Sequence, residues 1–481
     1  MTELTAARKR LILAICCMSL LIVGMDNTII NVALPSIGSD LHASLSDLQW
    51  TIDAYTLVLA SLLILSGSTA DRLGRRRTFQ TGLAIFTLGS LLCSVAPGLG
   101  WLVAFRMVQA VGGSMLNPVA MSIITNVFTG TKERAAAIGV WAGVIGISLG
   151  LGPVVGGLLI GAVSWRAIFW INVPIGVAAI VLTALFVPES KAARARRVDP
   201  VGQVLVIVTL ATLTYAIIEA PRHGWSSAAT LGTLAVAVVA ALGFVRYELH
   251  RREPLVEPRF FRSTPFTCAT LTAVFGFGAF AGFLFLNTLY LQNIRGYSPL
   301  LAGVCTLPLA AMTLIFGPIA GRIVGARGAR LPLTVAGLGM AASSAMLIGV
   351  GQHTSLVLVL ASYVVFGAGF AMLNPPITQS AVSGMPRSQA GVAAAVASTS
   401  RQVGATMGVA VVGSVLNSGL AGHPGLSGYS AASDPARIAV LVATVVVFVL
   451  GQVMSSSRAV ASASRSAALF AEEDAEALAA A

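Results

Sequence analysis

The fold of this chain is indicated by residues 67–77, Gly67-Ser68-Thr69-Ala70-Asp71-Arg72-Leu73-Gly74-Arg75-Arg76-Arg77. This stretch closes an apolar run at 49–70 with an abrupt cluster of four arginines and one aspartate. A run of that length crosses a hydrocarbon core of roughly 30 Å, and arginines gather at the cytoplasmic end of such a helix. The stretch therefore predicts a transmembrane helix that ends in the cytoplasm.

The same pattern recurs along all 481 residues, of which 56% are hydrophobic and only 10% are charged, with a mean hydropathy of +0.87. These values exclude a soluble domain and predict an all-α membrane protein. We expect about fourteen transmembrane helices, at 11–34, 49–70, 78–96, 101–122, 136–160, 166–187, 201–219, 228–248, 266–291, 299–320, 332–350, 355–377, 390–414 and 437–455. No small-residue cleavage site follows the first run, so we expect it to be retained as a helix.

The net charge of +12 reflects topology. Most of the 30 lysines and arginines fall on cytoplasmic segments when the N-terminus is placed in the cytoplasm, which is the positive-inside pattern. We expect both termini to be cytoplasmic and expect no nucleic-acid partner. The five cysteines lie within or at the ends of apolar runs and lack the spacing of a metal site, so we predict neither a disulfide framework nor a bound metal.

Polar signatures repeat between the two halves of the chain. Met115-Leu116-Asn117-Pro118 recurs as Met372-Leu373-Asn374-Pro375, and Gly67-x-x-Ala70-Asp71-Arg72 has an echo in Gly317-x-x-Ala320-Gly321-Arg322. Such repeats are typical of transporters built from duplicated bundles. We predict a six-helix bundle at 1–190, two inserted helices with basic linkers at 191–262, a second six-helix bundle at 263–456, and a disordered cytoplasmic tail at 457–481.

Four motifs resemble those of the major facilitator superfamily, in particular its fourteen-span drug:proton antiporters. They are Asp26-Asn27-Thr28-Ile29-Ile30-Asn31-Val32-Ala33-Leu34-Pro35, the stretch at 67–77, Arg106-Met107-Val108-Gln109, and Gly150-Leu151-Gly152-Pro153-Val154-Val155-Gly156-Gly157. The resemblance extends over almost the whole chain, to about residue 455. It implies two six-helix bundles that expose a substrate site to each side of the membrane in turn.

Charges inside the bilayer are costly unless they are paired, hydrated or neutralised, so they are functional candidates by default. At about 1.5 Å per residue, Asp26, Asp53 and Arg106 fall at one level in the outer half of the first bundle. A carboxylate beside an arginine stays ionised until the two are separated, and it then takes a proton readily in an apolar setting. We expect these three residues, with Glu219 at the end of the seventh run, to couple protons to transport. The alternative is a static ion pair that fixes helix packing.

The resemblance assigns two further roles. Gly67, Asp71, Arg72, Gly74 and Arg75 match a cytoplasmic latch that stabilises the outward-open state, although the arginines by themselves also satisfy the positive-inside rule. The glycine-rich pattern in the fifth run marks exporters and is thought to seal the outer half of the cavity, with ordinary close packing as the alternative. Its residues are Gly150, Gly152, Pro153, Gly156 and Gly157.

A cavity lined by amide and aromatic groups suits lipophilic or amphipathic substrates, because an uncompensated substrate charge would be costly to bury there. The candidates for this cavity are Asn31, Tyr55, Gln109, Asn117, Trp141, Asn287, Tyr290, Asn374, Gln379 and Arg401. No Asp or Glu occurs between Glu257 and Asp434. Arg401 therefore either meets an anionic group on a substrate or packs against backbone carbonyls.

Together these features predict a proton-coupled antiporter that exports drugs, antibiotics or toxic organic cations across the bacterial inner membrane, acting as a monomer. Alternatives are uptake, or transport of a lipid or siderophore, by the same fold. A polytopic sensor or enzyme is a further alternative, but the sequence shows no catalytic constellation. No Walker-type loop is present, so we expect no ATP, and we expect no cofactor other than the proton as coupling ion.

Overall fold

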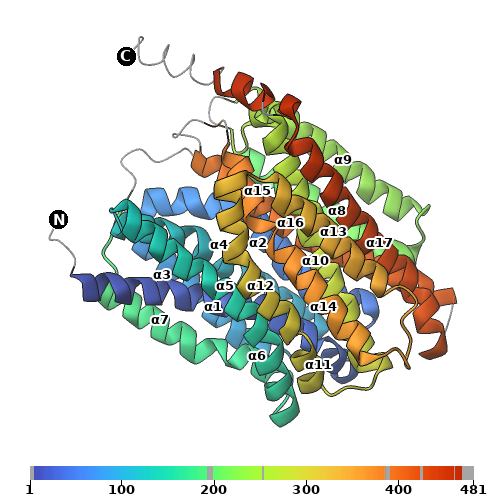
Figure 1. Cartoon of the computed structure of the whole chain (residues 1–481). Helices are drawn as coiled ribbons and strands as arrows, with labels where there is room; N and C mark the ends of the chain where they lie inside the picture. Colours follow the sequence, from blue (N-terminus) through green and yellow to red (C-terminus); the bar gives the residue numbers. More distant parts are fainter. Residues whose placement is uncertain are drawn as a thin grey trace. The chain divides into compact units, whose positions relative to one another are not determined.

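The computed structural model describes residues 5–191, 199–251, 254–383, 385, 390–422, 426–459 and 461–468, and this part of the chain is helical with short connections (Figure 1). A 3₁₀ turn at Pro258–Arg262 precedes α10, and a π-helical turn at Tyr290–Ile294 continues it. The α-helices are α1 (Ala6–Asp40), α2 (Leu45–Leu73), α3 (Arg75–Ser94), α4 (Leu99–Val127), α5 (Thr131–Ala162), α6 (Ala167–Trp170), α7 (Asn172–Phe186), α8 (Pro200–His223), α9 (Ala228–Leu249), α10 (Thr264–Leu289), α11 (Pro299–Cys305), α12 (Leu307–Arg327), α13 (Arg330–Met346), α14 (Leu356–Ala371), α15 (Asn374–Val382), α16 (Ala390–Gly422) and α17 (Leu426–Met454).

Each predicted apolar run coincides with one helix or with two consecutive helices. Within the described residues, twelve helical segments are long and apolar enough to cross a membrane, which makes this a multi-pass membrane protein. The two runs outside this set are α3, which opens on three arginines, and α13, which has 17 residues. The number of fourteen spans therefore stays a prediction.

The chain forms two compact units. Unit 1 contains Met1–Gln203 and Asn287–Ala310, and unit 2 contains Val204–Leu286 and Ala311–Ala481. The segment 287–310, which the repeat assigns to the second bundle, thus packs with the first six predicted runs. The predicted domain boundaries, and the six-plus-two-plus-six division, stay predictions.

The tail, for which the Ala/Ser-rich sequence predicts disorder with a short helix as the alternative, is helical where the structure describes it. Residues 457–459 and 461–468 are helical, whereas 469–481 lie outside the described residues. Ala459 and Ala463 are buried, and the Ser462 hydroxyl accepts a hydrogen bond from the Thr264 backbone at the start of α10 (2.9 Å). Alanine is the best helix former, and this Ala/Ser-rich segment packs against the start of α10, which together favour the helix over a disordered tail.

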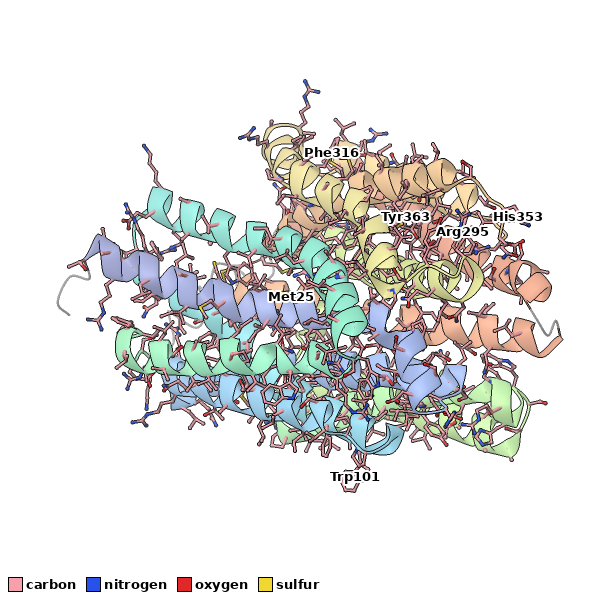
Figure 2. The ribbon with its side chains drawn as sticks, turned by 90° about the horizontal axis from the view of Figure 1, so that it is seen from below. Met25, Trp101, Arg295, Phe316, His353 and Tyr363 are labelled. Atoms are coloured by element: carbon pink, nitrogen blue, oxygen red, sulfur yellow. The ribbon has the colours of Figure 1, made fainter. Side chains whose placement is uncertain are left out.

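Local signals fix the ends of α2. Ser44 accepts a hydrogen bond from the Asp47 backbone, and the Asp47 carboxylate accepts one from the Ser44 backbone (2.9 Å), which together form a capping box. The helix ends before Gly74, whose φ of 111° strongly favours glycine. At the start of α4, Trp101 is largely exposed and points away from the protein, as expected of an aromatic side chain at a membrane interface (Figure 2).

Glycines on α5 let two neighbours approach closely. On one face, a Cβ at Gly152 would lie 3.1 Å from the carbonyl oxygen of Met25 on α1. On another face, a Cβ at Gly157 would lie 2.5 Å from the Cα of Leu300 on α11. By contrast, a Cβ at Gly161 would meet nothing within 4 Å. The glycine pattern therefore packs α5 between α1 and α11 within unit 1.

Replacing Gly157 by alanine tests this packing. We expect Gly157→Ala to lower the free energy of unfolding by about 2 kcal/mol, because the new methyl group meets the backbone of α11 and a helix must shift. The matched control, Gly161→Ala, should be neutral or should stabilise by up to about 1 kcal/mol, since alanine favours the helix. Thermal unfolding of the purified protein in detergent measures both, and equal effects of the two substitutions would contradict the packing.

Candidate functional site

A buried ion pair joins α1 and α4 within unit 1. The Asp26 Oδ2 atom accepts a hydrogen bond from Arg106 Nη1 at 2.5 Å, and neither side chain is more than 1% exposed. Figure 2 labels the neighbouring Met25 on α1. In a low-dielectric interior such a pair persists only when its remaining donors and acceptors are also satisfied. The surrounding helices supply these partners.

The second oxygen of Asp26 is held by two amides. Asp26 Oδ1 accepts hydrogen bonds from Gln109 Nε2 (2.8 Å) and from Asn172 Nδ2 (3.3 Å). Both amides also donate to the Ser90 hydroxyl of α3, at 2.8 and 3.4 Å. A Cβ at Gly89 would lie 2.6 Å from the Gln109 Cα, so only a glycine lets α3 come close enough for these contacts. The carboxylate is thus surrounded by donors from α4 and α7.

The Arg106 guanidinium has four further contacts. Its Nη1 donates to Gln109 Oε1 (2.7 Å), and its Nε donates to the Thr51 carbonyl of α2 (3.3 Å). The guanidinium carbon lies 4.1 Å from the Tyr55 ring centroid and 5.8 Å from that of Phe169. Cations over aromatic faces are stabilised by the ring quadrupole, most strongly where water is excluded. We call Asp26, Ser90, Arg106, Gln109 and Asn172 the Asp26 network.

Asp53 lies outside the Asp26 network. It is fully buried, and neither of its carboxylate oxygens has a hydrogen-bond partner within the described residues. Thr51 and Tyr55, four residues apart, share the face of α2 that contacts Arg106. Asp53 falls midway between them, roughly 200° around the helix, so its side chain leaves from the opposite face. Depth along the helix axis, from which its place was predicted, does not distinguish these faces.

Three network members are uncharged, and two of them, Ser90 and Asn172, were not among the predicted site residues. Ser90 is a small hydroxyl in an apolar run, of which this chain has many. Asn172 gives a better signal, because it is an amide within the predicted run 166–187 and an amide in an apolar setting needs partners. Glu219, the fourth predicted coupling residue, lies in unit 2 near the end of α8, where it accepts a hydrogen bond from Arg222 (3.4 Å).

The C-terminal end of α2 carries the predicted latch. Asp71 accepts a hydrogen bond from Arg75 one turn later (3.3 Å), while Arg72 is exposed and a Cβ at Gly67 would meet nothing within 4 Å. Gly74 adjoins Glu189, which was not among the predicted site residues. The Glu189 carboxylate accepts hydrogen bonds from the backbone of Arg76 (3.1 Å) and Arg77 (3.3 Å). It thereby caps the N-terminus of α3, where the helix dipole favours an anion.

The predicted cavity residues occupy different settings. Tyr55 and Gln109 both contact Arg106, whereas Asn31 is buried and donates to the Asn27 carbonyl (3.2 Å). Asn117 Oδ1 and Trp141 Nε1 are buried without a hydrogen-bond partner within the described residues. The others are Asn287 and Tyr290, buried in unit 1, Gln379, exposed in unit 2, and Asn374 and Arg401, bonded to each other in unit 2. Their role as a substrate cavity stays a prediction.

In the part of the chain that the structure describes, no group of three or more His, Cys, Asp or Glu side chains is arranged to hold a metal ion. A carboxylate paired with a cation, as in the Asp26 network, can bind a proton and separate charge. The network's one carboxylate is held by three donors, and its one cation rests on two aromatic rings.

A double-mutant cycle measures the coupling within the ion pair. We expect Asp26→Asn and Arg106→Gln each to cost about 3 kcal/mol of unfolding free energy, because each leaves a buried charge without its partner. The double variant should lose at least about 1 kcal/mol less than the sum of the two, since it leaves no orphaned charge. The exposed Lys9–Glu133 pair of the same unit, at 3.0 Å, is the control and should show a coupling below about 1 kcal/mol. Additive losses at Asp26 and Arg106 would contradict the network.

The cap on α3 is tested at Glu189. We expect Glu189→Ala to lower the unfolding free energy by about 1 kcal/mol, since the first backbone N–H groups of α3 lose their acceptor. Glu189→Gln keeps an acceptor oxygen and should lose less. Thermal unfolding in detergent provides the measurement, with Glu133→Ala as the surface control. An Ala variant as stable as wild type would show that water replaces the carboxylate at no cost.

Comparison with known proteins shows which family has this architecture. A model of the Major Facilitator Superfamily matches residues 16–409. The multidrug resistance protein Stp of Mycobacterium tuberculosis is 38% identical over 399 residues, covering 83% of this chain and 74% of that protein. The tetracenomycin C resistance and export protein of Streptomyces glaucescens is 37% identical over 399 residues, with the same coverage of each chain. A solved POT family transporter in complex with 5-aminolevulinic acid shares the fold, with a TM-score of 0.68 at 15% identity over 94% of this chain and 97% of that one. The chain belongs to the major facilitator superfamily of membrane transporters.

Proposed function

We propose that this protein exports lipophilic or amphipathic small molecules across the bacterial inner membrane in exchange for protons. Relatives that are 37–38% identical carry names of multidrug resistance and of antibiotic resistance and export, which supports export of such molecules. The glycine-rich pattern on α5, which marks exporters in the resembling antiporters, supports the same direction. The proton coupling is carried by one observation, the fully buried Asp26–Arg106 pair.

The pair is suited to coupling because its two states differ in charge. When Asp26 is ionised, its attraction to Arg106 and its amide bonds hold α1, α4 and α7 together. A proton on Asp26 removes the negative charge, and Arg106 keeps the Gln109 oxygen, the Thr51 carbonyl and the Tyr55 ring. Protonation therefore weakens the α1 side of the network and leaves the α2–α4 side in place. This difference biases the conformational equilibrium of alternating access.

The driving force is sufficient without ATP. One proton moving down 100 mV is worth about 2.3 kcal/mol, which sustains a substrate gradient of roughly fifty-fold at about 1.4 kcal/mol per decade. We further propose that α3 and α13 also span the membrane, which brings the number of spans to fourteen and both termini to the cytoplasm. The working form in this proposal is a monomer.

Transport in everted membrane vesicles tests the coupling. We expect wild-type vesicles to accumulate a lipophilic dye when respiration acidifies their lumen, and Asp26→Asn to abolish this accumulation, because the amide cannot exchange a proton. Dye counterflow without a proton gradient should persist in the variant, since the fold and the substrate site remain. The measurement is dye fluorescence against time, with and without an imposed pH jump.

Glu133→Gln is the matched control, since Glu133 is an exposed carboxylate on α5 outside the Asp26 network. Vesicles that contain this variant should accumulate dye as wild-type vesicles do. If the Asp26→Asn variant accumulates as much dye as wild type, Asp26 does not couple the proton. If wild type takes up dye only when the gradient is reversed, the protein imports. If no pH jump moves dye, proton exchange is refuted.

A further inference from the structure

Unit 2 contains an arginine that lacks, among the described residues, the carboxylate partner seen in unit 1. Both units contain an arginine in an apolar helix, Arg106 in α4 and Arg401 in α16, but only Arg106 has a carboxylate partner in the described residues. No Asp or Glu occurs between Glu257 and Asp434, so α10 through α16 supply none. An arginine inside a membrane protein without a counterion is costly, and such charges mark substrate or ion pathways.

The bonds of Arg401 fix it in place without neutralising it. Its Nη1 donates to Asn374 Oδ1 on α15 (3.1 Å), and its Nη2 donates to Ser398 Oγ one turn earlier on α16 (2.7 Å). Both acceptors are neutral, and a guanidinium carries five N–H donors. The side chains of Arg401, Asn374 and Ser398 are all partly accessible. The cation is therefore oriented and retains donors for another acceptor.

Aromatic faces adjoin this cation. The Arg401 guanidinium carbon lies 5.9 Å from the Phe277 ring centroid on α10. Phe277 meets Phe370 of α14 edge to face at 5.2 Å, and Phe280 stacks on Phe370 at 4.1 Å. A Cβ at Gly404, one turn after Arg401, would lie 2.7 Å from the Val274 Cα, so α16 and α10 pack closely enough to hold the cation beside the rings. Phe277 and Phe280 are partly accessible as well.

We propose that Arg401, Asn374 and Phe277 form a binding site for lipophilic aromatic anions, such as aromatic carboxylates or phenolates, among the exported substrates. The substrate carboxylate supplies the counterion that Arg401 lacks among the described residues, and the aromatic ring of the substrate packs against the phenylalanines. Charge-assisted hydrogen bonds are worth about twice neutral ones. The inference rests on the proposed export function for its physiological meaning, but the binding preference can be measured independently of transport.

Three probes that share one ring system separate charge from apolar affinity. They are 1-pyrenebutyrate, the neutral 1-pyrenebutanol and the cationic (1-pyrenebutyl)trimethylammonium. Fluorescence anisotropy on the purified full-length protein in a neutral detergent at pH 7.4 gives the dissociation constants. We expect wild type to bind pyrenebutyrate about tenfold more tightly than pyrenebutanol, which corresponds to one charge-assisted hydrogen bond.

Arg401→Gln should remove this preference and leave the pyrenebutanol constant within about twofold, because the rings remain. Arg401→Lys keeps the charge but not the planar fork, so it should retain part of the preference. Arg322→Gln, at an exposed arginine of α12, is the control and should bind as wild type does. If Arg401→Gln fails to fold, the wild-type preference and the lysine variant still decide the question.

Equal binding of the anion and the neutral probe by wild type would overturn the proposal. So would an Arg401→Gln variant that loses all three probes equally, because that is the signature of a packing role. Proton-driven uptake of the same probes into proteoliposomes separates this failure from that of the export function. If the ammonium probe moves and wild type shows no anion preference, export stands and the anion site falls. If no probe moves while the anion preference is present, the site stands and proton-driven export falls.

Discussion

The charge on Asp26 is the constraint around which unit 1 is built. A carboxylate with no exposed surface needs a cation and several donors, and these come from α4 and α7. Arg106 also needs partners, and it finds them on α2. It donates a hydrogen bond to the Thr51 carbonyl and lies over the Tyr55 ring. The close approach of α3 to α4 at Gly89 serves the same end, since it brings Ser90 within reach of both amides. One ionised group thus determines how five helices meet.

The sequence was sufficient to predict the helices and to place Asp26 and Arg106 at one depth, because both follow from position along the chain. The length of each apolar run shows that it can cross the membrane, and the number of residues from the end of the run gives the depth of a side chain in the bilayer. The remaining contacts could not be predicted from the sequence, because they depend on how each helix is rotated about its axis and on how neighbouring helices pack. Asp53 has a depth similar to that of its neighbours Thr51 and Tyr55 but the opposite helical phase. Ser90 carries no charge, and its role follows only from the approach of α3 to α4.

The roles of residues in the connecting segments could not be predicted from the sequence either. Glu189 lies after the last residue of α7, and nothing in its local sequence indicates that it caps α3, more than a hundred residues earlier. Its role depends on chain ends that meet only after the helices have packed. The grouping of 287–310 with unit 1 is a similar case, because a predicted repeat in the sequence does not say which segments are in contact. It arises where α11 packs on the glycines of α5, so side-chain size at a few positions outweighs the repeat.

The helix α5 links these observations. It contacts α1 beside Asp26, where a Cβ at Gly152 would nearly touch the Met25 carbonyl and where the Thr28 hydroxyl donates to the Ser148 carbonyl (3.4 Å). It also contacts α11 at Gly157, backbone against backbone. The side chains of Thr28 and Ile29 on α1 lie directly against Gly152 and Gly156, so these two helices are also in close contact. Close-packed interfaces respond by switching between arrangements rather than by deforming gradually, so under the proposed proton coupling these glycine contacts are the route by which a shift of α1 would reach α5 and the segment 287–310.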